Sequence, residues 1–150
     1  MALNTAAITQ AVAKLPISNV DIRDIDRIPD EVTVRNCPVM FPAPGEIASG
    51  YDNSPATFGG ASAAYWAVTR TMTWLYLHSP VGEGRATFSH FADLMKTADA
   101  IIENFMELDI DGVDILKVSI ENATKPLEVL AGDQFWGFSV TVLVREKVNA

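Results

Sequence analysis

Two histidines and a nearby glutamate are the side chains of this sequence best suited to hold a metal ion. His78 and His90 flank a short loop that contains Glu83, so folding could bring the three together. No pair of them has the i, i+4 spacing of a helical zinc site, and the single cysteine, Cys37, supplies no second set of ligands. We therefore expect no metal, cofactor or catalytic residue. A small metal- or ligand-binding enzyme built on these three residues is the least favoured function.

A denser group of ionisable side chains is an acidic run. The tetrapeptide at 109–112 resembles the start of a calcium loop, but its glycine comes two positions early and Ile120 stands where a bidentate glutamate is needed. Carboxylates at the C-terminal end of a helix also oppose the helix dipole. The run is either a solvated turn or an acidic surface facing a basic partner or a DNA channel. We take its members as candidate interface or lumen residues: Glu103, Glu107, Asp109, Asp111 and Asp114.

Arg70 is a cation within an otherwise apolar strand face. Either its stem packs while its head reaches solvent, or it forms an ion pair across a subunit contact, so it joins the candidate interface residues. The glycines at 79–85 lack the Gly-Lys-Ser/Thr ending of a phosphate-binding loop and the dinucleotide fingerprint, and no nucleophile elbow occurs. The absence of these motifs means that the sequence gives no support to an enzymatic function.

Composition limits the class of protein. The chain has 150 residues, which suits one domain with its own core, and 49% of them are hydrophobic. One cysteine excludes an internal disulfide, and we expect Cys37 to act as a small apolar residue beside Pro38. No run of 18 apolar residues and no basic-then-apolar N-terminus is present, so we expect neither a membrane span nor a secretory signal. The net charge of −8 opposes binding to phosphate backbones.

Two amphipathic helices are predicted. One covers about residues 5–14, because Asn4 and Thr5 are suitable N-caps and Pro16 ends it. The other covers about residues 88–108 and is the main packing element, since its apolar residues recur at helical spacing. Its expected buried face comprises Phe91, Leu94, Met95, Ala98, Ile101, Ile102 and Phe105.

The remaining elements are strands. A long strand is predicted at 65–78 and a second at 136–146, where apolar and polar residues alternate. Residues 116–121 alternate too, with Leu116, Val118 and Ile120 on the apolar face. A short strand is expected somewhere in 20–28 and another at 127–130. An interrupted edge strand is expected at 32–35 and 39–41, because Pro38 donates no hydrogen bond.

These elements predict an α+β fold. It has two layers, a mostly antiparallel sheet with one apolar face and two amphipathic helices packed on that face. The whole of 1–150 forms a single domain with a long loop at about 42–63, where proline and glycine are frequent and no periodicity is present.

The order of elements resembles the tail terminator (tail completion) proteins of long-tailed bacteriophages. The resemblance covers most of the chain. It rests on the N-terminal helix, the strand 65–77, the helix 88–108, and the ending Phe135-Trp136-Gly137-Phe138 that leads into a terminal strand near Glu146.

The resemblance implies a structural virion protein of the tail and neck, assembled in the host cytoplasm. Its subunits would form a ring, expected to be a hexamer, that caps the tail tube and meets a head-completion or neck protein. DNA would pass through the ring without specific binding, and an acidic lumen would suit that passage. The resemblance carries over no catalytic residue, cofactor or membrane contact. A head–tail connector or a tube subunit is the alternative.

Overall fold

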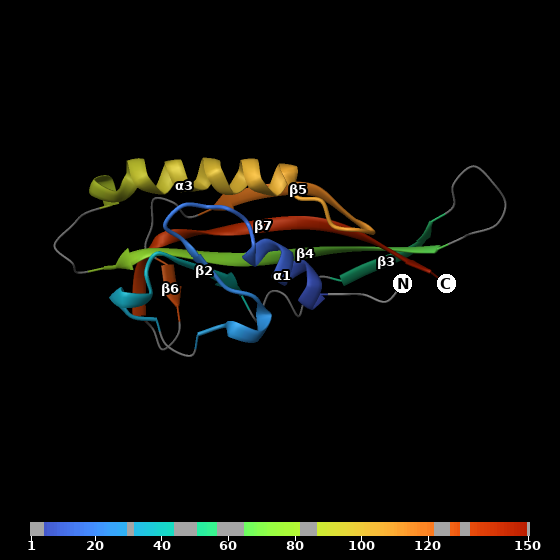
Figure 1. Ribbon diagram of the computed structural model, residues 1–150, viewed down its shortest axis with the longest axis horizontal. Helices are drawn as coiled ribbons and strands as arrows, with labels where there is room; N and C mark the ends of the chain where they lie inside the picture. The colour runs from blue at the N-terminus through green and yellow to red at the C-terminus, as the bar shows by residue number, and fades with distance from the viewer. Residues whose placement is uncertain are drawn as a thin grey trace.

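The computed structural model describes residues 5–29, 32–43, 51–56, 65–81, 87–121, 127–129 and 133–149. They form an α+β fold in two layers. Helix α1 (Thr5–Ala13) and helix α3 (Thr87–Glu107) share one core cluster with the sheet, so both lie on the same face. Figure 1 shows α3 along one side of the sheet and α1 nearer its middle. The expected fold class is confirmed.

The described strands form one sheet in the order β1-β2-β4-β7-β5. β3 pairs with β4, β6 pairs with β7, and all pairs are antiparallel except β1 with β2. The strands are β1 (Asp21–Ile22), β2 (Val39–Pro42), β3 (Tyr51–Ala56), β4 (Tyr65–Pro80), β5 (Val113–Glu121), β6 (Leu127–Val129) and β7 (Asp133–Asn149).

The centre of the sheet is the long antiparallel pair β4–β7. Even-numbered residues of both strands face the helices, and Met72, Trp74, Phe138 and Val140 are completely or almost completely buried there. The ring of Trp74 meets Phe105 of α3 edge-on, with 5.5 Å between ring centroids. This contact confirms that the predicted helix packs on the terminal strand pair, because alternating strand residues and helically spaced residues together build one core.

Only part of the expected buried face of α3 is covered. Leu94, Ala98, Ile101 and Phe105 are buried. Phe91 and Met95 are exposed by 39% and 37%, and Ile102 is half-buried. The prediction that all seven apolar residues face the sheet is therefore wrong, and α3 presents a second apolar stripe beside the buried one.

The sheet is not apolar on one face alone. A second, smaller cluster lies on the face opposite the helices, where odd-numbered residues of β2, β4 and β7 meet the segment that precedes β2. Its buried members are Val32, Val39, Phe41, Leu77 and Phe135. The expectation of a single apolar face is corrected, because Ile28, Val32 and Cys37 cover this end of the second face.

The segment before β4 departs from prediction at three places. Residues 34–36 form a short 3-10 helix (Val34–Asn36) instead of a strand. β2 lies between β1 and β4, so the predicted edge position is also wrong. Within the expected loop at 42–63, residues 51–56 form β3, and residues 44–50 and 57–64 lie outside the described part of the chain.

Strand β5 contains a bulge that changes which residues face the core. Val113 and Ile115 pack against the helix-covered core, the register with β7 shifts between Ile115 and Lys117, and Val118 continues on the core face. The additional residue, Leu116, is 51% exposed. The prediction that Leu116 belongs to the apolar face is wrong, because one inserted residue reverses the alternation.

Candidate functional site: an acidic surface beside an open sheet edge

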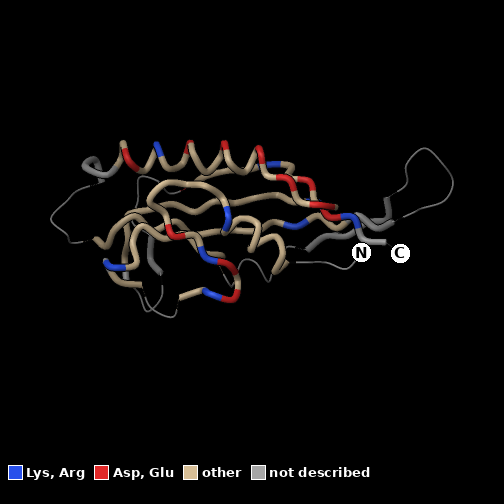
Figure 2. Tube along the Cα trace, in the orientation of Figure 1, with Lys and Arg blue, Asp and Glu red and all other residues tan. Residues whose placement is uncertain are grey.

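Helix α3 places a row of carboxylates away from the core. Its buried stripe fixes the rotation of the helix, so Glu103 and Glu107, one turn apart, both face solvent. The red segments in Figure 2 follow this outer side of α3 and continue into the turn before β5. The first two candidate residues are therefore neighbours on one exposed surface.

The turn between α3 and β5 adds the remaining three carboxylates. The Val113 N–H donates to the Ile110 carbonyl over 3.0 Å, and Gly112 has a φ of 75° that favours glycine. The carbonyl of Gly112 accepts from the Lys147 N–H over 3.1 Å, which holds the turn against β7. Asp109, Asp111 and Asp114 are all exposed around this turn.

The structure leaves all five acidic candidates exposed along α3, the following turn and the start of β5, and Asp114, between the core-facing Val113 and Ile115, points to the face of the sheet opposite α3. Among the described residues, none of the five carboxylates makes an ion pair with a basic side chain. Arg145 of β7 lies opposite Asp114 and partly offsets its charge, and the remaining excess of carboxylates attracts basic groups and repels phosphate backbones. This arrangement fits both interpretations of the acidic run. It can be a solvated turn, or it can be a surface that faces a basic partner or a DNA channel.

An open sheet edge lies directly beside the acidic surface. Of the described strands, β5 pairs with β7 and with no other, so its second side is unpaired. A hollow of about 320 Å³ lies between α3 and β5, lined by Ile102, Met106, Ile115, Leu116, Lys117 and Val118. Sequence reasoning missed this feature, because Ile102, Leu116 and Val118 were assigned to buried faces, while Met106 and Ile115 were assigned to no face.

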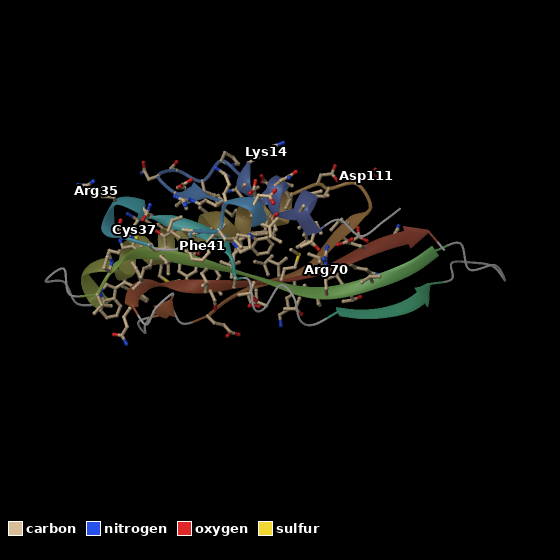
Figure 3. All side chains as sticks on the ribbon, turned by 90° about the horizontal axis from the view of Figure 1, so that it is seen from below. Lys14, Arg35, Cys37, Phe41, Arg70 and Asp111 are labelled. Atoms are coloured by element: carbon tan, nitrogen blue, oxygen red, sulfur yellow. The ribbon has the colours of Figure 1, made fainter. Side chains whose placement is uncertain are left out.

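Arg70 lies inside the chain and not at its surface. It is 1% exposed, and its guanidinium donates to the carboxylate of Glu146, which is 3% exposed, and to the hydroxyl of Thr5 at the start of α1. Figure 3 shows Arg70 on the helix-covered side of the sheet. The expectation that its head reaches solvent is wrong, and its ion pair is formed within the chain instead of across a subunit contact.

The histidine neighbourhood is described only in part. Glu83 and the side chain of His90 lie outside the described residues. His78 is half-buried, and its Nδ1 lies 3.1 Å from the hydroxyl of Tyr76, whose pKa burial raises to about 12. Both residues line a pocket of about 500 Å³ together with Asp93 and Lys96. Within the described ranges, no three acidic, histidine or cysteine side chains are grouped to hold a metal.

Cys37 is expected to react slowly with alkylating reagents. It is half-buried against the second apolar cluster, and burial raises the pKa of its thiol to about 11. The thiolate is the nucleophile, so a pKa near 11 instead of 9 lowers the reactive fraction about a hundredfold at pH 8. Iodoacetamide labelling followed by intact mass should be about a hundredfold slower in the folded chain than in denaturant. Equal rates would show that the thiol is accessible and ionises normally.

No helix in the described part of the chain has both the length and the apolar character needed to cross a membrane. No protein-family model matches the sequence, and no curated protein is significantly similar to it.

Proposed function

We propose that this chain is a ring-forming structural subunit of a phage tail, a tail terminator that caps the tail tube and joins it to the head or neck. The observation that carries the proposal is the exposed acidic surface formed by α3 and the turn before β5. Five exposed carboxylates are carried by the helix, the hydrogen-bonded turn and the start of β5, and no ion pair is recorded for them among the described residues. The resemblance in the order of elements supplies the class of assembly.

The function follows from geometry and charge. A ring stops a polymer when one of its faces matches the end of the polymer and the other face does not. A negative lumen lets a polyanion pass, because it offers phosphates no cations to bind. In this arrangement the acidic surface lines the channel, while other surfaces meet the tube protein, the neck protein and neighbouring copies.

The direct test mixes the purified chain with purified tail tubes of the virus to which the proposal assigns it. Negative-stain microscopy should show a ring seated at one end of each tube, and native mass spectrometry should give its copy number. A variant that replaces the five carboxylates with Gln or Asn should still fold and cap tubes, because all five side chains are exposed. A chain that never joins tube ends would contradict the proposal.

A head–tail connector or a tube subunit is the nearest alternative, and position in the particle separates them. A tube subunit would be present in many copies and would polymerise by itself. The pocket beside Tyr76 and His78 favours a third possibility, a small-ligand domain. If tube capping survives His78→Ala unchanged, that pocket is not part of the function.

A further inference from the structure

Helix α3 has more apolar surface than its own sheet covers. Phe91, Met95, Ile102 and Met106 form a stripe with spacings of 4, 7 and 4 residues, so they lie on one side of the helix. Met106 is 75% exposed. Of the five large apolar side chains exposed among the described residues, three belong to this stripe and a fourth is Leu116 of β5. The exposed apolar surface is therefore concentrated at the open edge of the sheet.

The usable part of that edge is short. The bulge at Leu116 interrupts β5, and edge bulges limit pairing with further strands. Beyond the bulge, residues 117–121 keep regular register with β7. Val118 and Ile120 face the core side, while Lys117, Ser119 and Glu121 face the other side. No described strand pairs with this side of the five residues, so they can receive one more strand beneath the exposed side of α3.

The five residues are complementary to themselves in antiparallel pairing. Paired residues must face the same side, so Lys117, Ser119 and Glu121 pair among themselves. A two-fold axis at Ser119 places Lys117 of each copy opposite Glu121 of the other. The same axis places Val118 opposite Ile120 twice. One register thus gives two ion pairs and two apolar pairs.

The apolar stripe on α3 is also complementary to its own copy when the two helices are related by the two-fold axis at Ser119. In antiparallel pairing, Phe91 of one copy lies opposite Met106 of the other, and Met95 lies opposite Ile102. Ile102 and Met106 line the hollow together with residues 115–118 of β5. With a rise of about 1.5 Å per helical residue and about 3.3 Å per strand residue, the midpoint of the stripe falls near residue 119. Helix and strand therefore share one two-fold axis.

From this coincidence we propose that the β5 edge and the α3 stripe form a two-fold interface with a second copy of this chain. A net charge of −8 opposes self-association in general, so a stable contact needs local charge complementarity such as this register supplies. The contact closes on two copies and builds no ring. It therefore goes beyond the proposed function and does not depend on it.

Charge exchange across the interface tests the register. The full chain should sediment as a concentration-dependent dimer in analytical ultracentrifugation. Lys117→Glu and Glu121→Lys should each raise the dimer dissociation constant about tenfold, because each places like charges opposite one another twice. The double variant restores both pairs with reversed sign and should return to within about threefold of the parent. Lys96→Glu makes the same charge change outside the stripe and should leave dimerisation unchanged.

A second variant tests the helical half. Met106→Ser removes an apolar side chain that is 75% exposed, so it should weaken the dimer without lowering the melting temperature. A chain that is monomeric at every concentration, or a dimer that the charge exchange neither weakens nor restores, would overturn the proposal. Capping of tubes is read separately by microscopy. A chain that caps tubes but shows no charge-dependent dimer keeps the proposed function and rejects this interface.

Discussion

Replacing Arg70 with methionine is expected to lower the free energy of unfolding by about 3–5 kcal/mol, the cost of breaking a buried ion pair by removing one partner. Arg70 pairs with Glu146 on the helix-covered face, and neither residue is more than 3% exposed. Without the guanidinium, the carboxylate stays buried without its counter-charge, and Thr5 loses a donor that ties α1 to the sheet. Urea unfolding followed by tryptophan fluorescence measures the change.

Two comparisons separate the buried charge from general loss of packing. Replacing both partners, Arg70→Met with Glu146→Leu, should cost much less than either single change, since no charge is then left buried. The control is the surface pair formed by Arg23 and Asp21 over 3.1 Å, whose side chains are 23% and 51% exposed. Arg23→Met should change stability by less than about 1 kcal/mol. A loss that small for Arg70→Met would contradict the buried-pair interpretation.

The long elements could be predicted because their periodicity reports burial directly. Residues 88–108 have the helical repeat and residues 136–144 the strand repeat, and each buries the face that its repeat predicts at the centre of the sheet. What the repeat does not report is how far the opposing layer extends. Phe91 and Met95 continue the helical pattern of α3, yet the sheet does not cover them.

Local irregularities were beyond reach for a different reason. The bulge at Leu116 depends on the register between β5 and β7, which no spacing within β5 encodes. The second apolar cluster likewise forms because Ile28, Val32 and Cys37, from the part of the chain before β2, pack against the sheet. The bulge and the second cluster both depend on tertiary contacts between segments that are distant in the sequence.

The candidate site shows the same division. The five carboxylates could be grouped from sequence because a helix and a short turn connect them, and the structure places all five on the surface. Arg70 could not be assigned, because its partner Glu146 lies 76 residues further along the chain. An arginine in an apolar strand predicts a partner but does not identify it, so solvent and a second subunit were wrongly preferred.

Gly137→Ala is expected to destabilise the fold by about 3 kcal/mol, because overpacking at a rigid contact forces the backbone to move. Gly137 pairs with Leu77, next to the shift in register between Leu77 and Ser79. A methyl group on Gly137 would lie 2.0 Å from the carbonyl oxygen of Tyr76 and 3.1 Å from the Cα of Leu77. Both are backbone atoms of the central strand, so no side-chain rotation relieves the clash.

The clash should also be visible in the core. The rings of Tyr76 and Phe138 lie 4.6 Å apart across β4 and β7, so separating the strands at Gly137 should reduce the near-ultraviolet circular dichroism as well as the stability. Gly112→Ala is the matched control, because its φ of 75° makes alanine unfavourable by only about 1–2 kcal/mol. If Gly137→Ala costs no more than Gly112→Ala and leaves the aromatic signal unchanged, the two central strands are not held as closely at this point as the structure shows. In that case, close contact between β4 and β7 would not explain why a glycine follows the aromatic residues at the start of β7.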